Sequence, residues 1–329
     1  MRGGAELLAE RLTVELAARG HEAALVTVPF KWYPGTRVLT QAFLWRLVDL
    51  EEVDGAPVDL VIATKFPSYL VRHPNKVVWL VHQFRQAYEL DRTELGQFGE
   101  APEERALRRK VHDLDRVALG EARAFYAISG NVVDRLERTL GLQAEALLPP
   151  PQDLPYRVGE YGDFVLSVNR LDRAKRIDLL LEAAAADPAL RVVLAGTGPD
   201  RERLESIARE RGLDGRATFL GRVGDEELAG LYGSCLAVYY APYDEDYGMV
   251  PYEAYRAERP VVTTHDSGWV TVAVEDRRTG IVCPPRAAAI ADACAWLREH
   301  PEEAAAYGRA GRERSEQITW EHVVSRLLS

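Results

Sequence analysis

The chain contains few cysteines and no long apolar segment. Its three cysteines, Cys235, Cys283 and Cys294, are odd in number and show no Cys-x-x-Cys spacing. This argues against a disulfide framework and against a structural zinc site. No apolar run reaches the ~18 residues of a membrane-spanning helix, and the first residues lack the pattern of a signal peptide. We therefore expect a soluble protein of the reducing cytoplasm.

An excess of basic residues is also absent. The formal net charge is −10 at pH 7, which argues against a nucleic acid as the partner. With 28% charged residues, the composition is that of an ordinary globular protein. A length of 329 residues favours two domains or one large one.

Four prolines lie within residues 149–155. Because proline continues neither a helix nor a central strand, this stretch is predicted to be an extended connector. We therefore place a domain boundary there, with a first domain of residues 1–150 and a second of residues 151–317. Residues 320–328 are predicted to form one further helix.

Short apolar runs alternate with amphipathic stretches in both halves. This alternation predicts α/β domains with doubly wound parallel sheets, whose ligands bind beyond the carboxyl ends of the strands. In the first half we expect a helix at residues 5–19 and strands at residues 23–28, 60–63, 77–81 and 124–128. In the second half we expect strands at residues 164–168, 191–195, 217–220, 237–240 and 260–263.

A glutamate pair follows the fourth predicted strand of the second half. Glu245 precedes Gly248, and Glu253 lies about one turn into the next helix. The amides of Gly248, Met249 and Val250 would point off the helix N-terminus toward phosphate or sugar oxygens. Two carboxylates beside them could accept hydrogen bonds from sugar hydroxyls. The alternative is that both glutamates are solvated or capping charges.

A basic turn follows the first predicted strand of the second half. It contains Asn169, Arg170 and Lys175. A guanidinium and an ammonium at one sheet edge could together hold a diphosphate. The alternative is a solvated turn whose cations pair with Asp172 or Asp178.

Two glycine turns follow the next two strands. Residues 196–199 read Gly-Thr-Gly-Pro, and no third glycine follows at the dinucleotide spacing, which disfavours a nicotinamide site. Residues 219–223 read Phe-Leu-Gly-Arg-Val, where backbone groups of Gly221, Arg222 and Val223 could meet a base edge.

Together these segments resemble the retaining family-4 glycosyltransferases (glycosyl transferases group 1), which have the GT-B fold. The resemblance covers nearly the whole chain and is most specific over residues 164–285. It consists of a glutamate pair with seven residues between, an arginine and a lysine five apart, and three turns in the family's order. The matching positions are Glu245 and Glu253, Arg170 and Lys175, and residues 194–199, 219–223 and 275–285.

The resemblance implies two Rossmann-like doubly wound domains facing a central cleft, with a helix at residues 318–329 returning toward the first domain. It also implies transfer of a sugar from a UDP- or GDP-sugar to the hydroxyl of a glycan, a lipid-linked acceptor or a small molecule, with no cofactor. Arg170 and Lys175 would neutralise the diphosphate, so we expect no metal. Glu245 would bind the transferred sugar and Glu253 the ribose. The remaining donor-binding positions would be Asn169, Gly196, Gly221, Arg222, Val223, Tyr247, Gly248, Met249 and Val250.

In the first domain, the resemblance implies a glycine-rich loop at Gly3 and Gly4 and an active-site histidine at His82. Ser129 matches the family's serine at the start of a helix, where helix capping explains it equally well. Only Met1 and Arg2 precede Gly3, where the family has a first strand before the glycine loop, so we expect this domain to lack that strand. Trp269 stands where many relatives have glycine or proline.

Two other functions stay open at this point. One is a nucleotide-sugar epimerase or hydrolase on the same fold, and the other is a non-catalytic nucleotide-sugar-binding protein. A basic cluster at Arg105, Arg108, Arg109 and Lys110 could give peripheral contact with the inner face of a membrane. The alternative is a solvated helix face balanced by nearby acidic residues.

Overall fold

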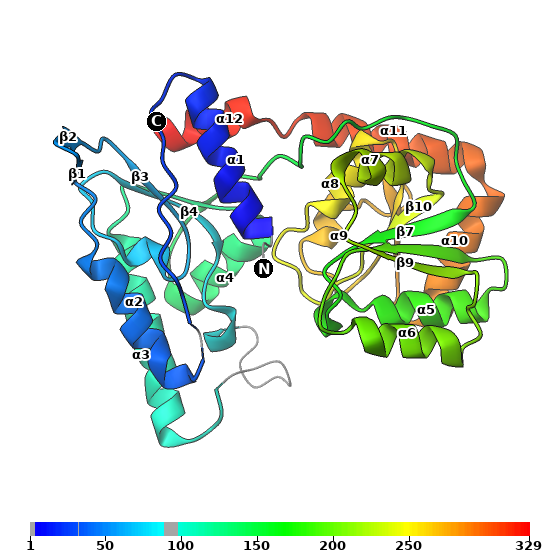
Figure 1. Cartoon of the computed structure of the whole chain (residues 1–329), viewed down its shortest axis with the longest axis horizontal. Coiled ribbons are helices and arrows are strands. Elements are labelled where there is room, and N and C mark those ends of the chain that lie inside the picture. The colour runs from blue at the N-terminus through cyan, green and yellow to red at the C-terminus, as the bar shows by residue number, and fades with distance from the viewer. Residues whose placement is uncertain (1–3, 32, 89–97) are drawn as a thin grey trace. The chain divides into compact units, whose positions relative to one another are not determined.

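The computed structural model describes residues 4–31, 33–88 and 98–329. It divides into two compact units (Figure 1). Unit 1 contains Met1–Pro149 and Trp320–Ser329, and unit 2 contains Pro150–Thr319. Residues 147–162 contain no helix or strand, as expected for a connector with four prolines.

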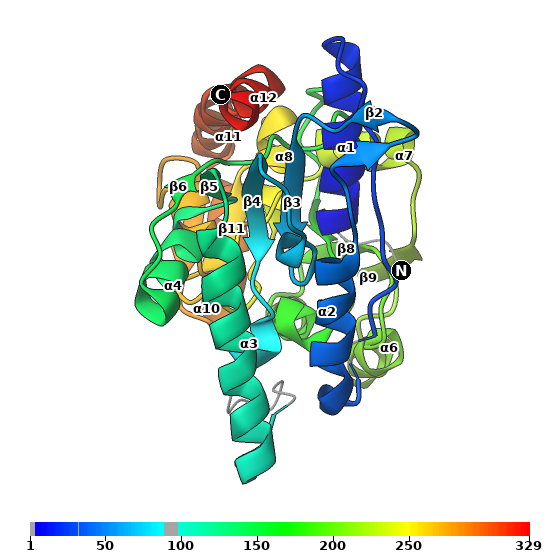
Figure 2. The ribbon, with the colours of Figure 1, turned by 90° about the vertical axis from the view of Figure 1, so that its left-hand side faces the viewer.

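Unit 1 has a parallel sheet in the order β3-β4-β5-β6. Its strands are β3 (Val61–Lys65), β4 (Lys76–His82), β5 (Ala124–Ala127) and β6 (Glu145–Ala146). Its helices are α1 (Gly4–Ala18), α2 (Val38–Leu47), α3 (Pro102–Gly120), α4 (Gly130–Leu140) and α12 (Trp320–Leu328). A short hairpin is formed by β1 (Glu52–Val53) and β2 (Ala56–Pro57). Figure 2 shows the helices of this unit around the sheet.

The strand predicted at residues 23–28 is absent, and that prediction was wrong. This segment is irregular, and Leu25 and Val26 are each 45% exposed. A strand needs a neighbour that pairs with its backbone, but the described part of the sheet ends at β3. The prediction rested on the apolar and β-branched residues of this segment, and such a composition does not show whether a neighbouring strand is present to pair with it.

Unit 2 has a six-stranded parallel sheet in the order β12-β11-β10-β7-β8-β9. The strands are β7 (Phe164–Val168), β8 (Arg191–Ala195), β9 (Ala217–Gly221), β10 (Ala237–Tyr239), β11 (Val261–Thr264) and β12 (Gly280–Cys283). The helices are α5 (Ile177–Ala186), α6 (Arg201–Glu210), α7 (Asp225–Ser234), α8 (Val250–Arg256), α9 (Val270–Ala273), α10 (Ala287–Glu299) and α11 (Pro301–Glu316).

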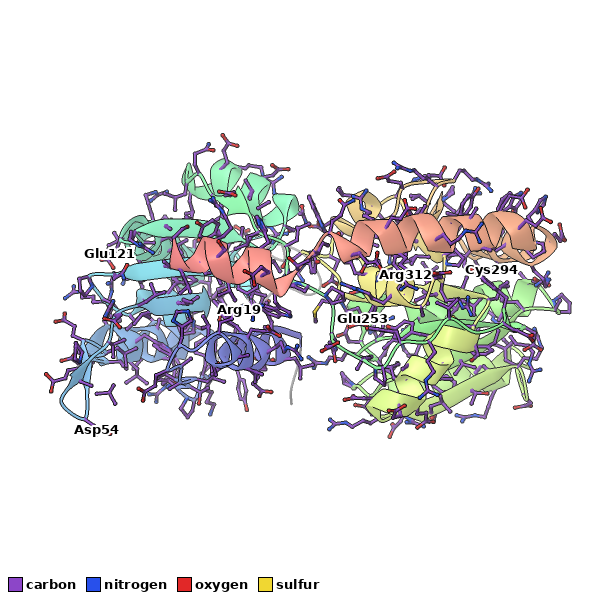
Figure 3. All side chains as sticks on the ribbon, turned by 90° about the horizontal axis from the view of Figure 1, so that it is seen from above. Arg19, Asp54, Glu121, Glu253, Cys294 and Arg312 are labelled. Atoms are coloured by element: carbon purple, nitrogen blue, oxygen red, sulfur yellow. The ribbon has the colours of Figure 1, made fainter. Side chains whose placement is uncertain are left out.

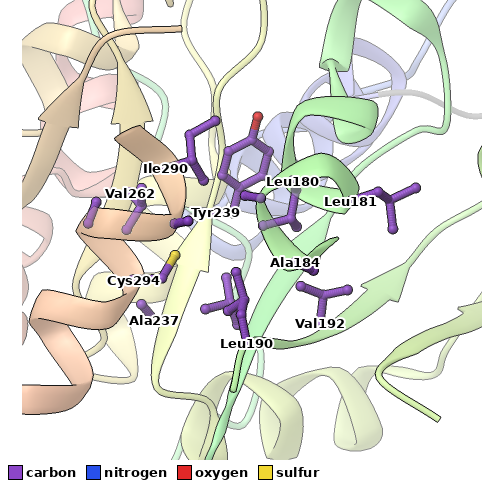
Figure 4. Packing of buried hydrophobic residues seen from close by; sticks show 14 of the residues in the cluster. Leu180, Leu181, Ala184, Leu190, Val192, Ala237, Tyr239, Val262, Ile290 and Cys294 are labelled. Atoms are coloured by element: carbon purple, nitrogen blue, oxygen red, sulfur yellow. The ribbon is translucent and has the colours of Figure 1, made fainter. Parts of the chain in front are cut away.

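The core of unit 2 lies between this sheet and its helices. Leu180 and Leu181 of α5 and Ile290 and Cys294 of α10 are buried against the strands (Figure 4). All three cysteines of the chain are free and buried, and burial raises the pKa of the Cys294 thiol to about 12. This core holds the strands in register and so fixes where the loops at their carboxyl ends emerge.

Candidate functional site

The strand order of unit 2 reverses between β7 and β10, which pair directly. In open α/β sheets, ligands bind at such a point, beyond the carboxyl ends of the strands. The loops that begin there are residues 169–176 after β7 and residues 240–249 after β10. These two loops carry most of the site residues predicted from the sequence.

An ion pair joins the two loops. Lys175 Nζ donates a hydrogen bond to Glu245 Oε2 and lies 3.3 Å from Tyr240 Oη. Burial disfavours the charged ammonium, but the Glu245 carboxylate outweighs burial and raises the pKa of Lys175 above its ordinary value. Lys175 therefore keeps its positive charge at neutral pH.

Arg170 belongs to the same loop but lies elsewhere on it. Its side chain is 57% exposed, and its Nε lies 3.8 Å from Asp172 Oδ2. The structure thus pairs Lys175 with Glu245 and sets Arg170 in solvent beside Asp172. A loosely held, exposed guanidinium can turn toward an anion at little cost in side-chain desolvation.

Arg176 is a residue that the sequence reasoning missed, and it connects three loops. Its guanidinium donates hydrogen bonds to the carbonyls of Ala241 (2.9 Å) and Pro242 (3.0 Å). It also binds both carboxylate oxygens of Asp266, at 2.7 and 2.9 Å, in a forked geometry. Desolvation opposes ionisation of Asp266, but the hydrogen bonds from Arg176 outweigh it and lower the pKa of Asp266. The loops after β7, β10 and β11 are therefore tied at one guanidinium.

The backbone of Arg176 has the left-handed conformation, with φ of +48°. This conformation is unfavourable for most residues that carry a Cβ. We expect Arg176→Ala to destabilise the chain by about 2 kcal/mol, because Asp266 and two carbonyls lose their donor. Arg176→Gly loses the same bonds but adopts a positive φ freely, so it should cost about 1 kcal/mol less. Thermal unfolding of the two variants checks this order, and a glycine variant less stable than the alanine variant would contradict it.

The backbone of Glu245 is held by the loop after β11. Trp269 N donates to Glu245 O at 3.0 Å, and Glu245 N donates to Ser267 O at 3.3 Å. Gly268 has φ of +63°, and a Cβ there would lie 2.5 Å from Glu245 O. Only glycine permits this close approach without a shift of the backbone.

Glu253 of α8 is buried, with 2% of its surface exposed. Its Oε2 accepts a hydrogen bond of 2.7 Å from Tyr232 Oη. Burial raises the pKa of Glu253, although the bond from Tyr232 opposes the rise. Its place in unit 2 is labelled in Figure 3. The hydrogen bond from Tyr232, on α7, was not predicted from the sequence.

The residues before α8 are packed tightly. Tyr247 is buried and stacks on Tyr252 with ring centroids 5.2 Å apart, so it forms part of the interior. Gly248 has φ of +77°, and a Cβ there would lie 2.7 Å from a ring carbon of Tyr240. Met249 and Val250 are half-buried where α8 begins.

The glycine turn after β8 packs on the turn after β7. Leu171 N donates to Thr197 O at 3.0 Å. A Cβ on Gly196, whose φ is +138°, would lie 1.8 Å from the carbonyl oxygen of Asn169. Asn169 itself is buried, and its Nδ2 donates to Ser167 Oγ at 2.9 Å. Gly196 therefore allows the two turns to pack closely against each other.

The turn after β9 contacts the glycine turn after β8. Gly196 N donates a hydrogen bond of 2.7 Å to Gly221 O, and Gly221 has φ of +74°. Arg222 is exposed and Val223 is half-buried. Arg222 and Val223 thus come directly after Gly221, which is hydrogen-bonded to the turn after β8.

The site residues predicted in the first domain belong to unit 1. His82 ends β4, and its Nδ1 lies 2.7 Å from Gln83 O. Gly4 is the exposed first residue of α1, and Gly3 lies outside the described residues. Ser129 caps α4, where its Oγ accepts a hydrogen bond from Val132 N at 3.3 Å.

The site geometry can be compared with known proteins. Residues 157–314 match the family model of glycosyl transferases group 1. Unit 2 is a glycosyl transferases group 1 domain. This confirms the resemblance to glycosyl transferases group 1 over these residues, and the segment that matches contains the Lys175–Glu245 pair, Arg176 and Glu253.

Curated relatives of this glycosyl transferases group 1 domain are glycosyltransferases by name. D-inositol 3-phosphate glycosyltransferase of Saccharomonospora viridis is 33% identical over 173 residues, which are 48% of this chain and 40% of the relative. Alpha-D-kanosaminyltransferase of Streptomyces kanamyceticus is 32% identical over 210 residues, which are 57% of this chain and 54% of the relative. The matches thus span about half the length of these relatives or less.

Solved structures confirm the predicted GT-B fold. Sucrose-phosphate synthase from Thermosynechococcus elongatus superimposes with a TM-score of 0.77 at 22% identity, covering 98% of this chain and 92% of that chain. Anabaena HepE in complex with UDP and glucose gives a TM-score of 0.70 at 17% identity, covering 99% and 96%. The group 1 domain is thus one of two Rossmann-like units in this chain.

Proposed function

We propose that this chain is a retaining glycosyltransferase that moves a sugar from a nucleoside diphosphate sugar to an acceptor hydroxyl. The donor is a UDP- or GDP-sugar, and the acceptor is a glycan, a lipid-linked acceptor or a small molecule. The reaction takes place in the cytoplasm and needs no metal ion. The names of the curated relatives and the UDP and glucose bound to HepE support this proposal.

The observation that carries the proposal is the Lys175–Glu245 pair where the strand order reverses. A cation that stays protonated suits a diphosphate, and a carboxylate suits sugar hydroxyls. Arg170, exposed on the loop of Lys175, supplies a second cation. Glu253, held by Tyr232, is proposed to accept hydrogen bonds from the ribose hydroxyls.

In the proposed reaction, the bond between the anomeric carbon and the departing phosphate oxygen breaks while the acceptor oxygen bonds to the same face of that carbon. The leaving phosphate takes the acceptor's proton, which balances the step. Lys175 and Arg170 stabilise the negative charge that develops on the diphosphate. Glu245 orients the transferred sugar, so neither glutamate acts as the nucleophile of a retaining glycosidase.

A thermal-shift panel tests the donor class. We expect UDP or GDP, each with or without its sugar, to raise the unfolding temperature, while ADP and dTDP do not. At a ligand concentration of about 100 times Kd, binding stabilises the native state by about 2.7 kcal/mol. A folded chain that responds to none of the four nucleotides would contradict the proposal.

A transfer assay with the donor so identified tests the reaction. We expect a glycosylated product with a retained anomeric configuration, and a rate that persists in EDTA. A donor converted to another sugar nucleotide would indicate an epimerase, and tight nucleotide binding without turnover would indicate a binding protein. A rate lost in EDTA and restored by magnesium would overturn metal independence.

A further inference from the structure

Helices α2 and α3 of unit 1 lie side by side (Figures 1 and 2) and carry an apolar surface open to solvent. Phe43 and Leu47, one turn apart on α2, are 47% and 80% exposed, and Val117 on α3 is 58% exposed. Between the helices lies a groove of about 300 Å³, lined by Leu39, Phe43, Lys110, Asp113, Leu114 and Val117. Exposed apolar side chains gathered at one groove are typical of a surface that binds a protein, a membrane or a ligand.

Basic residues outnumber acidic ones in the part of α3 that borders this groove. From Arg105 to Arg116, α3 carries five basic residues and two acidic ones. One of the acids, Asp115, is fully buried and accepts hydrogen bonds from Tyr69 and Tyr88. Asp113, whose Oδ1 lies 3.3 Å from Arg116 Nη1, is therefore the acid that this stretch presents to solvent. The local excess of cations stands out in a chain of net charge −10.

We propose that this surface, the α2–α3 face, docks on the anionic surface of a lipid bilayer. Phe43 and Leu47 insert at the boundary between headgroups and acyl chains, and Arg109 and Lys110 bind lipid phosphates. Cations beside exposed apolar side chains are the combination that holds helices at membrane interfaces. In a symmetric dimer formed through this face, the cations of one α3 would meet those of the other, and this repulsion favours a bilayer over a second copy of the chain. No helix among residues 4–31, 33–88 and 98–329 is long and apolar enough to span a bilayer, so the contact is peripheral.

Sedimentation of the full chain with vesicles tests the proposal, and it measures binding without any need for transfer activity. We expect binding to vesicles of phosphatidylcholine mixed with phosphatidylglycerol, and little binding to phosphatidylcholine alone. Salt should weaken the binding, because it screens exposed charges. Failure of the folded chain to bind the anionic vesicles would overturn the proposal.

Variants assign the binding to the α2–α3 face. Arg109→Gln with Lys110→Gln should weaken binding roughly 30-fold, since each cation near an anionic surface contributes about 1 kcal/mol. Phe43→Ser with Leu47→Ser should weaken it at least about 10-fold. The matched controls are Arg138→Gln, an exposed cation on α4, and Val14→Ser, a residue on α1 that is 59% exposed.

The controls should bind like the unaltered chain, and all variants should keep its unfolding temperature because the altered side chains are exposed. Equal losses in controls and face variants would overturn the assignment to this face. Analytical ultracentrifugation without lipid separates the competing occupant. Self-association that Leu47→Ser abolishes would identify a second copy of the chain as the occupant and overturn the bilayer assignment.

Discussion

Lys175→Ala is expected to lower the transfer rate roughly 10²–10³-fold, the effect of removing one preorganised group that stabilises charge in a transition state. Nucleotide affinity should fall as well, because the ammonium meets the diphosphate before and during bond cleavage. Steady-state kinetics with saturating acceptor, together with calorimetric titration of the nucleotide, measures both effects. Unchanged kinetics in a folded variant would remove Lys175 from the site.

A control separates this effect from a general loss of positive charge. Arg173 lies in the same short 3-10 turn as Lys175 and is exposed, so Arg173→Ala should leave the rate within about 2-fold of the unaltered chain. Glu245→Gln tests the partner of Lys175. If the pair acts as a unit, the double variant should lose less than the product of the two single losses.

Gly196→Ala is expected to destabilise unit 2 by about 4 kcal/mol, an unusually large effect for the addition of one methyl group. The new Cβ would lie 1.8 Å from the carbonyl oxygen of Asn169, at a φ of +138° that alanine disfavours. Either the glycine turn or the turn after β7 has to move. For a unit of this size, the unfolding temperature should fall by about 8–16 °C, which calorimetry measures.

Gly230→Ala is the matched control. Gly230 lies within α7, and a Cβ there meets nothing within 4 Å. Alanine has the higher helix propensity, so this variant should be stabilised by up to about 1 kcal/mol. If both alanine variants unfolded at the temperature of the unaltered chain, the close packing of Gly196 on Asn169 would be contradicted.

Five of the six described strands of unit 2 could be predicted because most of their residues are apolar, whereas β12 was not predicted. Residues 164–168 and 191–195 are strands with the expected bounds, since a parallel strand covered on both faces needs no alternation of apolar and polar residues. The same rule failed at residues 23–28. There the composition suits a strand, but pairing depends on a neighbouring strand that local composition does not reveal.

The site was only partly predictable for a related reason. Lys175 and Glu245 were predicted as site residues of two separate turns, but their ion pair was not predicted, because it depends on β7 lying beside β10 in the sheet. Arg176 was missed for the same reason, since its partners lie in loops 65 to 90 residues further along the chain. Likewise, the burial of Glu253 against Tyr232 depends on how α7 packs beside α8.

Helix α12 belongs to unit 1 but is translated after the whole of unit 2, so unit 1 can complete its folding only at the end of synthesis. Trp320 packs edge-on against Trp79, with ring centroids 6.2 Å apart, and Tyr126 Oη donates to Arg326 O at 2.9 Å. During synthesis, every residue of unit 2 leaves the ribosome before these contacts can form. The half of the protein translated first is therefore the half completed last. Expressed alone, residues 1–149 would leave Trp79 without its contact to Trp320, and the missing helix would have to be supplied as a separate peptide.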